Sequence, residues 1–189
     1  MSVTTSSDGR SSRKKRLTIV LGAVCAVIVI VVVSIFTGGQ VTNGNEPTSK
    51  LVGTSVATFS LSGLDSGTVE APWKSHHAAV LIFFASYCGP CKSEMPKVAT
   101  YLRDHSEGSI RVIGVDALDS RAPAKAFVKR SGVTFPIAFD PNGVVTTGIF
   151  QFAYVPETVF VSATGVLRQV YYGAIPKDVL VKGIAALRA

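Results

Sequence analysis

Cys88 and Cys91 are the two side chains of this 189-residue chain whose types and spacing are best suited to chemistry. Two thiols separated by two residues can close a reversible disulfide. Residues 80–84, just before them, have the continuous apolar character of a buried strand, and residues 92–105 have the pattern of a helix. We therefore predict that the pair lies where a strand ends, and that the helix begins at the second cysteine.

A helix N-terminus changes the acidity of cysteines placed there. Its free amide groups and the positive end of its dipole stabilise a thiolate, and only the thiolate attacks a disulfide. In C-x-x-C motifs the pKa of such a thiol falls to about 3.5–7.5 from about 8.5. We predict that Cys88, on the solvent side of the turn, is the attacking sulfur and that Cys91 resolves the mixed disulfide. Between them, Pro90 suits the first turn of a helix, and Gly89 lets another backbone approach closely.

A C-x-x-C pair can also be half of a zinc site, which needs two further ligands. The remaining Cys and His residues of the chain are Cys25, His76, His77 and His105. The histidines lack the H-x(3–5)-H spacing of zinc sites, and Cys25 lies in a segment that is predicted to span a membrane. A copper-relay protein is a second metal alternative, although such proteins more often carry three residues between the two cysteines and a distal ligating His. We expect no metal and no other cofactor.

The N-terminal region predicts a membrane anchor. Residues 17–36 are twenty residues without a charge, which as a helix would span about 30 Å, the thickness of the apolar core of a bilayer. Five basic residues and one acidic residue precede this segment. The positive-inside rule then leaves the N-terminus in the cytoplasm and the rest of the chain outside, where disulfides persist. A cleaved signal peptide is the alternative, although the apolar run is long and lacks a small-x-small cleavage site.

The net charge of +7 reflects this topology more than a binding surface. Residues 37–189 hold fourteen Lys and Arg residues against eleven Asp and Glu residues. No basic stripe interleaved with aromatic residues is present, so nucleic acid is not an expected partner. The expected organisation is a cytoplasmic basic tail (1–16), a transmembrane signal anchor (17–36), a flexible polar linker (37–50) and one folded domain (51–189).

The folded domain alternates strand and helix patterns. Beyond the segments around Cys88, the predicted elements are a hairpin (57–61 and 67–70), strands at 78–84 and 110–115, a helix at 122–131, a strand at 135–139 followed by a turn at 140–143, an antiparallel strand pair (157–161 and 166–172) and a helix at 176–187. This order predicts an α/β fold in which helices flank a central mixed sheet.

Two segments carry a resemblance to a known family. Residues 83–96, Phe-Phe-Ala-Ser-Tyr-Cys-Gly-Pro-Cys-Lys-Ser-Glu-Met-Pro, resemble the active-site segment of thioredoxin-fold proteins. Residues 154–158, Tyr-Val-Pro-Glu-Thr, resemble the segment of that fold that carries a cis-proline. The resemblance covers about residues 52–187. With the predicted anchor, the chain is most similar to membrane-anchored, extracytoplasmic thiol-disulfide oxidoreductases, notably those that reduce apocytochrome c for haem attachment.

The resemblance implies roles for individual residues. Pro156 would be the cis-proline that faces the cysteine pair, and Val155 would offer its backbone to an extended substrate. Glu94, three residues after Cys91, would handle the proton of that cysteine. The alternative is that Glu94 is a first-turn acid that complements the helix dipole or pairs with Lys97.

Two residues depart from the thioredoxin pattern. Tyr87 stands where a tryptophan is usual, which keeps an aromatic lid over the site. Ile82 replaces the buried aspartate of thioredoxin, which favours Glu94 as the proton carrier. The residues expected to contact substrate are Tyr87, Gly89, Pro90, Val155 and Pro156.

The reaction implied is thiol-disulfide exchange with protein substrates, most simply the reduction of disulfides in secreted proteins such as apocytochrome c. A reductant outside the cytoplasm must be reduced again after each reaction, so we expect a membrane thiol carrier as its electron donor. Two alternatives stay open from the sequence. The same chemistry can run backwards, as an oxidant or isomerase in protein folding, or the pair can belong to a non-catalytic redox sensor or metal-binding module.

Overall fold

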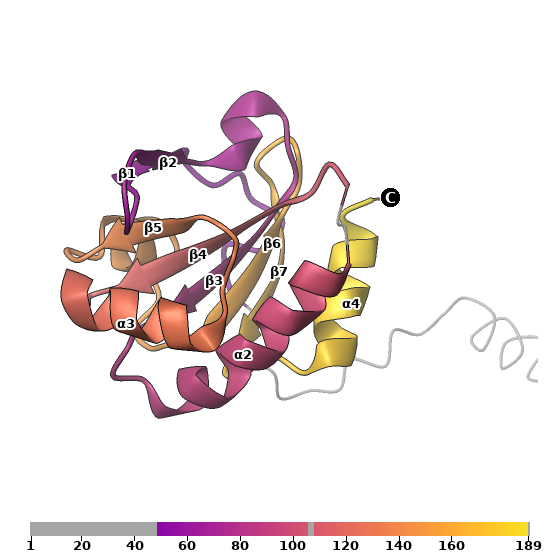
Figure 1. The fold of residues 1–189 in the computed structure, drawn as a ribbon. Coiled ribbons are helices and arrows are strands. Elements are labelled where there is room, and N and C mark those ends of the chain that lie inside the picture. The colour runs from indigo at the N-terminus through magenta and orange to yellow at the C-terminus, as the bar shows by residue number, and fades with distance from the viewer. Residues whose placement is uncertain (1–48, 106–107, 189) are drawn as a thin grey trace, which may run out of the picture. The chain divides into compact units, whose positions relative to one another are not determined.

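The computed structural model of the chain describes residues 49–105 and 108–188, which form the predicted folded domain (Figure 1). The predicted basic tail, the predicted transmembrane anchor and nearly all of the predicted linker lie outside the described residues. Among the residues that are described, no helix is both long enough and apolar enough to cross a membrane.

A five-stranded mixed sheet forms the centre of the domain, with the strand order β5-β4-β3-β6-β7. Its strands are β3 (Ala79–Phe84), β4 (Arg111–Ala117), β5 (Ile137–Asp140), β6 (Glu157–Val161) and β7 (Leu167–Tyr172). The central strand β3 pairs in parallel with β4 and antiparallel with β6. All six of its residues are buried, because both faces of the sheet are covered, and this explains its continuous apolar sequence.

Three helices cover one face of the sheet (Figure 1). They are α2 (Gly89–Asp104), α3 (Arg121–Ser131) and α4 (Lys177–Ala186). Met95 of α2, Phe127 of α3 and Leu180 of α4 are each at most 2% exposed and belong to one core cluster with the even-numbered residues of β3. The helix α2 follows β3 after a four-residue connection, so the C-terminal end of the central strand determines where the cysteines lie.

The opposite face is covered by irregular segments and short elements. These are β1 (Ser60–Ser62) and β2 (Thr68–Glu70), which pair as an antiparallel hairpin, the 3-10 helix η1 (Pro72–Ser75) and the π-helix η2 (Val144–Ile149). Aromatic rings fill this second cluster. Phe83 makes edge contacts with Phe150 and Phe152, and Trp73 makes one with Phe59.

The predicted α/β class, the mixed sheet and the order of its elements are confirmed by this arrangement. The helix η2 is a difference, because no helix was predicted between the turn at residues 140–143 and β6. The Asp140 carboxylate explains it: Oδ2 accepts hydrogen bonds from the backbone N–H groups of Val145 and Thr146 and from the Thr146 hydroxyl. Such side-chain hydrogen bonds leave no trace in hydrophobic periodicity.

Candidate active site

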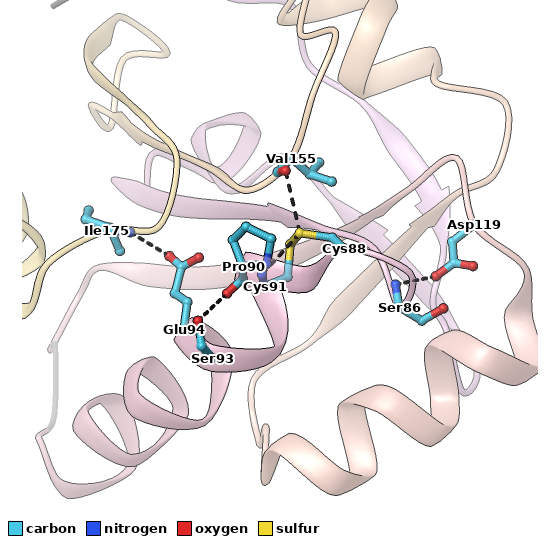
Figure 2. Close-up of a disulfide and its surroundings, with 9 residues drawn as sticks. All are labelled: Ser86, Cys88, Pro90, Cys91, Ser93, Glu94, Asp119, Val155 and Ile175. Atoms are coloured by element: carbon cyan, nitrogen blue, oxygen red, sulfur yellow. Dashed lines mark hydrogen bonds between the residues drawn. A yellow bond between two sulfur atoms is a disulfide. The ribbon is translucent and has the colours of Figure 1, made fainter.

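Cys88 and Cys91 are joined by a disulfide at the N-terminus of α2 (Figure 2). The helix begins at Gly89, earlier than the predicted start at the second cysteine, and Cys88 itself is its N-cap. Gly89 and Pro90 can occupy the first two helical positions because the N–H groups there have no partner within the helix. The backbone N–H of Cys91 donates a hydrogen bond to Cys88 Sγ at 3.1 Å. The sulfur that is predicted to attack is therefore the atom that caps the helix.

The two cysteines differ in exposure. Cys88 is 7% exposed and Cys91 is 1% exposed. This difference agrees with the prediction that Cys88 is the outer sulfur and Cys91 the inner one, although both are largely covered. Cys88 Sγ also lies 3.5 Å from the carbonyl oxygen of Val155. A disulfide sulfur carries no proton, so this contact can be a hydrogen bond only when Cys88 is a thiol.

The peptide bond between Val155 and Pro156 is cis, as the resemblance implies. It lies just before β6, and Figure 2 shows the Val155 carbonyl directed at the Cys88 sulfur. A hollow of about 200 Å³ adjoins the same sulfur. It is lined mainly by the segment 152–155, by Ala117 at the end of β4 and Leu118 after it, and by the predicted contact residues Tyr87 and Pro90.

The predicted contact residues Tyr87, Gly89 and Pro90 lie at the surface. Tyr87 is 62% exposed, and Gly89 has open space where a Cβ would be. Tyr154, which was predicted only as part of the cis-proline segment, is 82% exposed and also lines the hollow. Two aromatic side chains that solvent reaches therefore line the hollow beside the sulfur of Cys88.

Glu94 is buried in α2 rather than lying on its surface, with 5% exposure. Its Oε1 accepts a hydrogen bond from the backbone N–H of Ile175 at 3.0 Å, in the segment that leads into α4 (Figure 2). Burial raises the pKa of Glu94 to about 7, and the Ile175 hydrogen bond opposes the rise. An acid in this state can take up or release a proton near neutral pH, which an exposed first-turn acid cannot do.

Three further acids near the site were not predicted. Asp119 accepts a hydrogen bond from the backbone N–H of Ser86 at 2.6 Å. Asp116 of β4 is 0% exposed, and burial, followed by the nearby Asp119, raises its pKa to about 8. Glu157 follows the cis-proline, is 4% exposed, and has its pKa raised to about 8 by burial. The sequence signal that could have identified Asp116 and Glu157 is an acidic residue within an otherwise apolar strand pattern.

The histidines do not join the cysteines within the described part of the chain. His76 is the C-cap of η1 and His77 follows it, so both precede β3, whereas Cys88 follows the other end of that strand. Residues 49–105 and 108–188 contain no group of three or more His, Cys, Asp or Glu side chains that could hold a metal ion.

Comparison with known proteins adds an independent finding. Residues 52–170 match the AhpC/TSA family. The thiol-disulfide oxidoreductase ResA of Oceanobacillus iheyensis is 26% identical over 115 residues, which cover 61% of this chain and 59% of that relative. ResA of Bacillus subtilis is 23% identical over 168 residues, which cover 89% of this chain and 91% of the relative.

Solved structures agree with these relatives. The structure of MTB dsbF is 28% identical, superposes with a TM-score of 0.61, and covers 68% of this chain and 94% of its own. A thiol:disulfide interchange protein DsbE from Chlorobium tepidum, 24% identical, superposes with a TM-score of 0.64 over 73% of this chain and 98% of its own, and supports the fold alone.

The predicted thioredoxin-like fold is thus confirmed, and so is the predicted enzyme class, since the bonded Cys88–Cys91 pair occurs in a chain whose relatives are thiol-disulfide oxidoreductases. The chain belongs to the AhpC/TSA family of thioredoxin-fold proteins.

Proposed function

We propose that this protein is a membrane-tethered thiol-disulfide oxidoreductase that acts outside the cytoplasm and reduces disulfides in exported proteins, with apocytochrome c as the expected substrate. The observation that carries the proposal is the placement of one sulfur. Cys88 Sγ caps α2, accepts the Cys91 N–H, and faces the Val155 carbonyl beside the cis-proline.

This placement suits an extended peptide substrate. The backbone of Val155 can pair with a substrate backbone that runs past Cys88, and the neighbouring hollow of about 200 Å³ has room for one large side chain. The hollow is mostly apolar, and the exposed rings of Tyr87 and Tyr154 stand at its edge. A cysteine-containing segment that is unfolded or extended fits this surface better than a cysteine in a rigid core.

The reaction consists of two exchange steps. The Cys88 thiolate attacks one sulfur of the substrate disulfide, the substrate S–S bond breaks, and the leaving sulfur takes a proton. Cys91 then loses its proton and attacks Cys88 Sγ, which breaks the mixed disulfide and releases the second substrate thiol. Two electrons pass to the substrate, and the protein is left with the Cys88–Cys91 disulfide. A thiol carrier in the membrane restores the dithiol.

Glu94 is the acid or base of the second step in this proposal. Cys91 is buried, so its proton needs a nearby acceptor, and Glu94 lies one helical turn further along α2. Its pKa of about 7 matches that work near neutral pH. A hollow of about 460 Å³ beside Glu94 and Ile175 gives the carboxyl a route for exchanging its proton with solvent.

One observation favours the opposite direction as the second candidate. The cap hydrogen bond to Cys88 Sγ stabilises a thiolate, and stabilising the reduced form makes a disulfide a stronger oxidant. Redox direction is therefore decided by measurement. We expect the Cys88–Cys91 potential, measured by equilibration with dithiothreitol, to lie near that of thioredoxin, at about −270 mV. A value near −120 mV would contradict reduction and support an oxidant.

The tether and the location belong to the proposal as well. They rest on the apolar segment 17–36 and the basic residues before it. We expect a membrane-impermeant maleimide to label Cys88 in intact cells after mild reduction, in a Cys25→Ser background that leaves only the two site cysteines. Labelling that requires lysis would contradict an extracytoplasmic domain.

Substrate trapping tests the activity itself. Cys91→Ser removes the resolving thiol, so mixed disulfides through Cys88 should accumulate in cells, and the Cys88→Ser, Cys91→Ser double variant is the matched control. Recovery of c-type apocytochromes supports the proposal. Recovery of many unrelated exported proteins would indicate general folding, and recovery of none would support a redox sensor.

A further inference from the structure

A carboxyl group that the proposed mechanism does not use binds the backbone of the loop that carries Cys88. Asp119 follows β4, and its Oδ2 accepts a hydrogen bond from the backbone N–H of Ser86 at 2.6 Å (Figure 2). Its Oδ1 accepts one from the N–H of Ser120, also at 2.6 Å. The first of these contacts joins residues 33 positions apart and fixes the chain two residues before the cysteine.

A second carboxyl group, that of Asp116, lies close enough to Asp119 to interact with it electrostatically. Asp116 is in β4, in register with Phe84, the last residue of β3, and it is 0% exposed. No donor among the described residues reaches either of its carboxyl oxygens. Asp119 is the charged neighbour that raises the pKa of Asp116 most. Two carboxyl groups can form a hydrogen bond only when one of them keeps a proton, and burial favours the neutral form of the more deeply buried group.

On balance, the charged groups around Asp116 also favour the neutral form of its carboxyl. Asp119 and Asp140 disfavour its ionisation, whereas Arg121 favours it. The Arg121 guanidinium is engaged elsewhere, because it donates hydrogen bonds to backbone carbonyls of the β1–β2 hairpin and lies 4.1 Å from the centre of the Phe139 ring. Burial is the largest cause of the pKa of about 8 at Asp116.

We propose that Asp119, held in place by the protonated carboxyl of Asp116, is a positioning residue that fixes the loop of residues 86–88 and thereby keeps the Cys88 sulfur at the N-terminus of α2. Neither acid touches the reacting sulfurs. When Asp116 loses its proton, two adjacent carboxylates repel each other, and the hold on the Ser86 N–H weakens. The loop is therefore firmly held at neutral pH and loosens in the alkaline range.

Amide hydrogen exchange of the oxidised full-length protein tests the first half of this proposal. Asp119→Ala removes the acceptor of the Ser86 N–H, so exchange in the peptide that contains Ser86 should accelerate about tenfold or more. Asp119→Asn keeps a side-chain carbonyl at the same place and should restore most of the protection. Asp104→Asn, at an exposed acid at the end of α2, is the control and should match wild type. Equal Ser86 protection in wild type and Asp119→Ala would overturn the proposal.

The role of Asp116 is tested by pH. Asp116→Asn donates an N–H to Asp119 at every pH, so its Ser86 protection should stay level, whereas that of wild type should fall about tenfold relative to the variant between pH 6.5 and 9.5. Parallel curves for wild type and variant would overturn the shared-proton half of the proposal. If Asp116→Asn does not fold, as circular dichroism would show, the wild-type curve decides by itself. Protection that does not weaken through pH 8, after correction for intrinsic exchange, would then be the contrary result.

The consequence for reactivity is measured separately and rests on the proposed function. In a Cys25→Ser background, the rate at which the reduced protein reacts with a small aromatic disulfide should fall about tenfold in Asp119→Ala and stay within about twofold of wild type in Asp119→Asn. An unchanged rate in Asp119→Ala, with Ser86 protection lost, would show that the loop is held but that its position does not affect catalysis. Slow exchange in the parent protein with Ser86 protection intact would instead count against the proposed function and leave the loop contact established.

Discussion

Replacing Glu94 by Gln should make the protein more stable at alkaline pH and leave it nearly unchanged at acid pH. The carboxyl is buried, and its pKa rises from 4.5 in the unfolded chain to about 7 in the folded protein. Between these values the folded state binds more protons than the unfolded state, so stability falls as pH rises from about 4.5 to 7 and then levels off. The shift corresponds to about 3 kcal/mol at 1.36 kcal/mol per unit.

Gln isolates this contribution because it is neutral at every pH and its carbonyl can still accept the Ile175 N–H. The assay is urea unfolding of the oxidised protein, followed by the fluorescence of Trp73, the single tryptophan, which is 6% exposed. The two proteins should differ little at pH 4.5, and the variant should be more stable by about 3 kcal/mol at pH 8.

The matched control is Glu70→Gln, at an exposed acid that pairs with Lys74. Its difference from wild type should be within about 1 kcal/mol and should change little between pH 4.5 and 8. A Glu94→Gln difference that is equally flat over this range would refute the reasoning, because Glu94 would then titrate alike in the folded and unfolded protein.

Three other substitutions follow from packing and burial. Gly165→Ala should cost about 2 kcal/mol in urea unfolding, because Gly165 has a φ of +80° and a Cβ there would lie 2.8 Å from Trp73 Cδ1; an unaltered midpoint would contradict the close approach. Phe83→Ala should cost about 3–5 kcal/mol, since the ring is 0% exposed and contacts two other rings, and a loss below about 1 kcal/mol would mean that the cluster repacks. Glu157→Gln should become progressively more stable than wild type as pH rises from about 4.5 to about 8, where the difference levels off, because burial raises the pKa of the native carboxyl to about 8; identical stability-pH curves would argue against that burial.

The elements that position the cysteines could be predicted from the sequence because their signals are local. The apolar run of β3 and the apolar positions of α2 produced boundaries within a few residues of those observed. The start of α2 was misplaced because hydrophobic periodicity does not show a cap, and here the cap is a cysteine sulfur.

Contacts across the fold could not be predicted in the same way. The hydrogen bond from the Ile175 N–H to Glu94 joins residues 81 positions apart, and the contact between Ser86 and Asp119 joins residues 33 apart. The first contact depends on how the segment before α4 packs against α2, and the second on where the end of β4 lies relative to the loop before α2. The local sequence pattern does not encode such tertiary contacts. The cis bond before Pro156 was anticipated only through the resemblance to thioredoxin-fold proteins, because few X–Pro bonds are cis in general.

The cap formed by the Cys88 sulfur has a consequence for the whole catalytic cycle. The Cys91 N–H needs only a lone pair on that sulfur, and a sulfur keeps lone pairs whether it is a thiolate, part of a mixed disulfide or part of the internal disulfide. The first turn of α2 can therefore stay in place while the bonding partner of the sulfur changes. An exchange centre built in this way demands little backbone reorganisation between turnovers, so the enzyme can pass electrons on with its helix end as a rigid support.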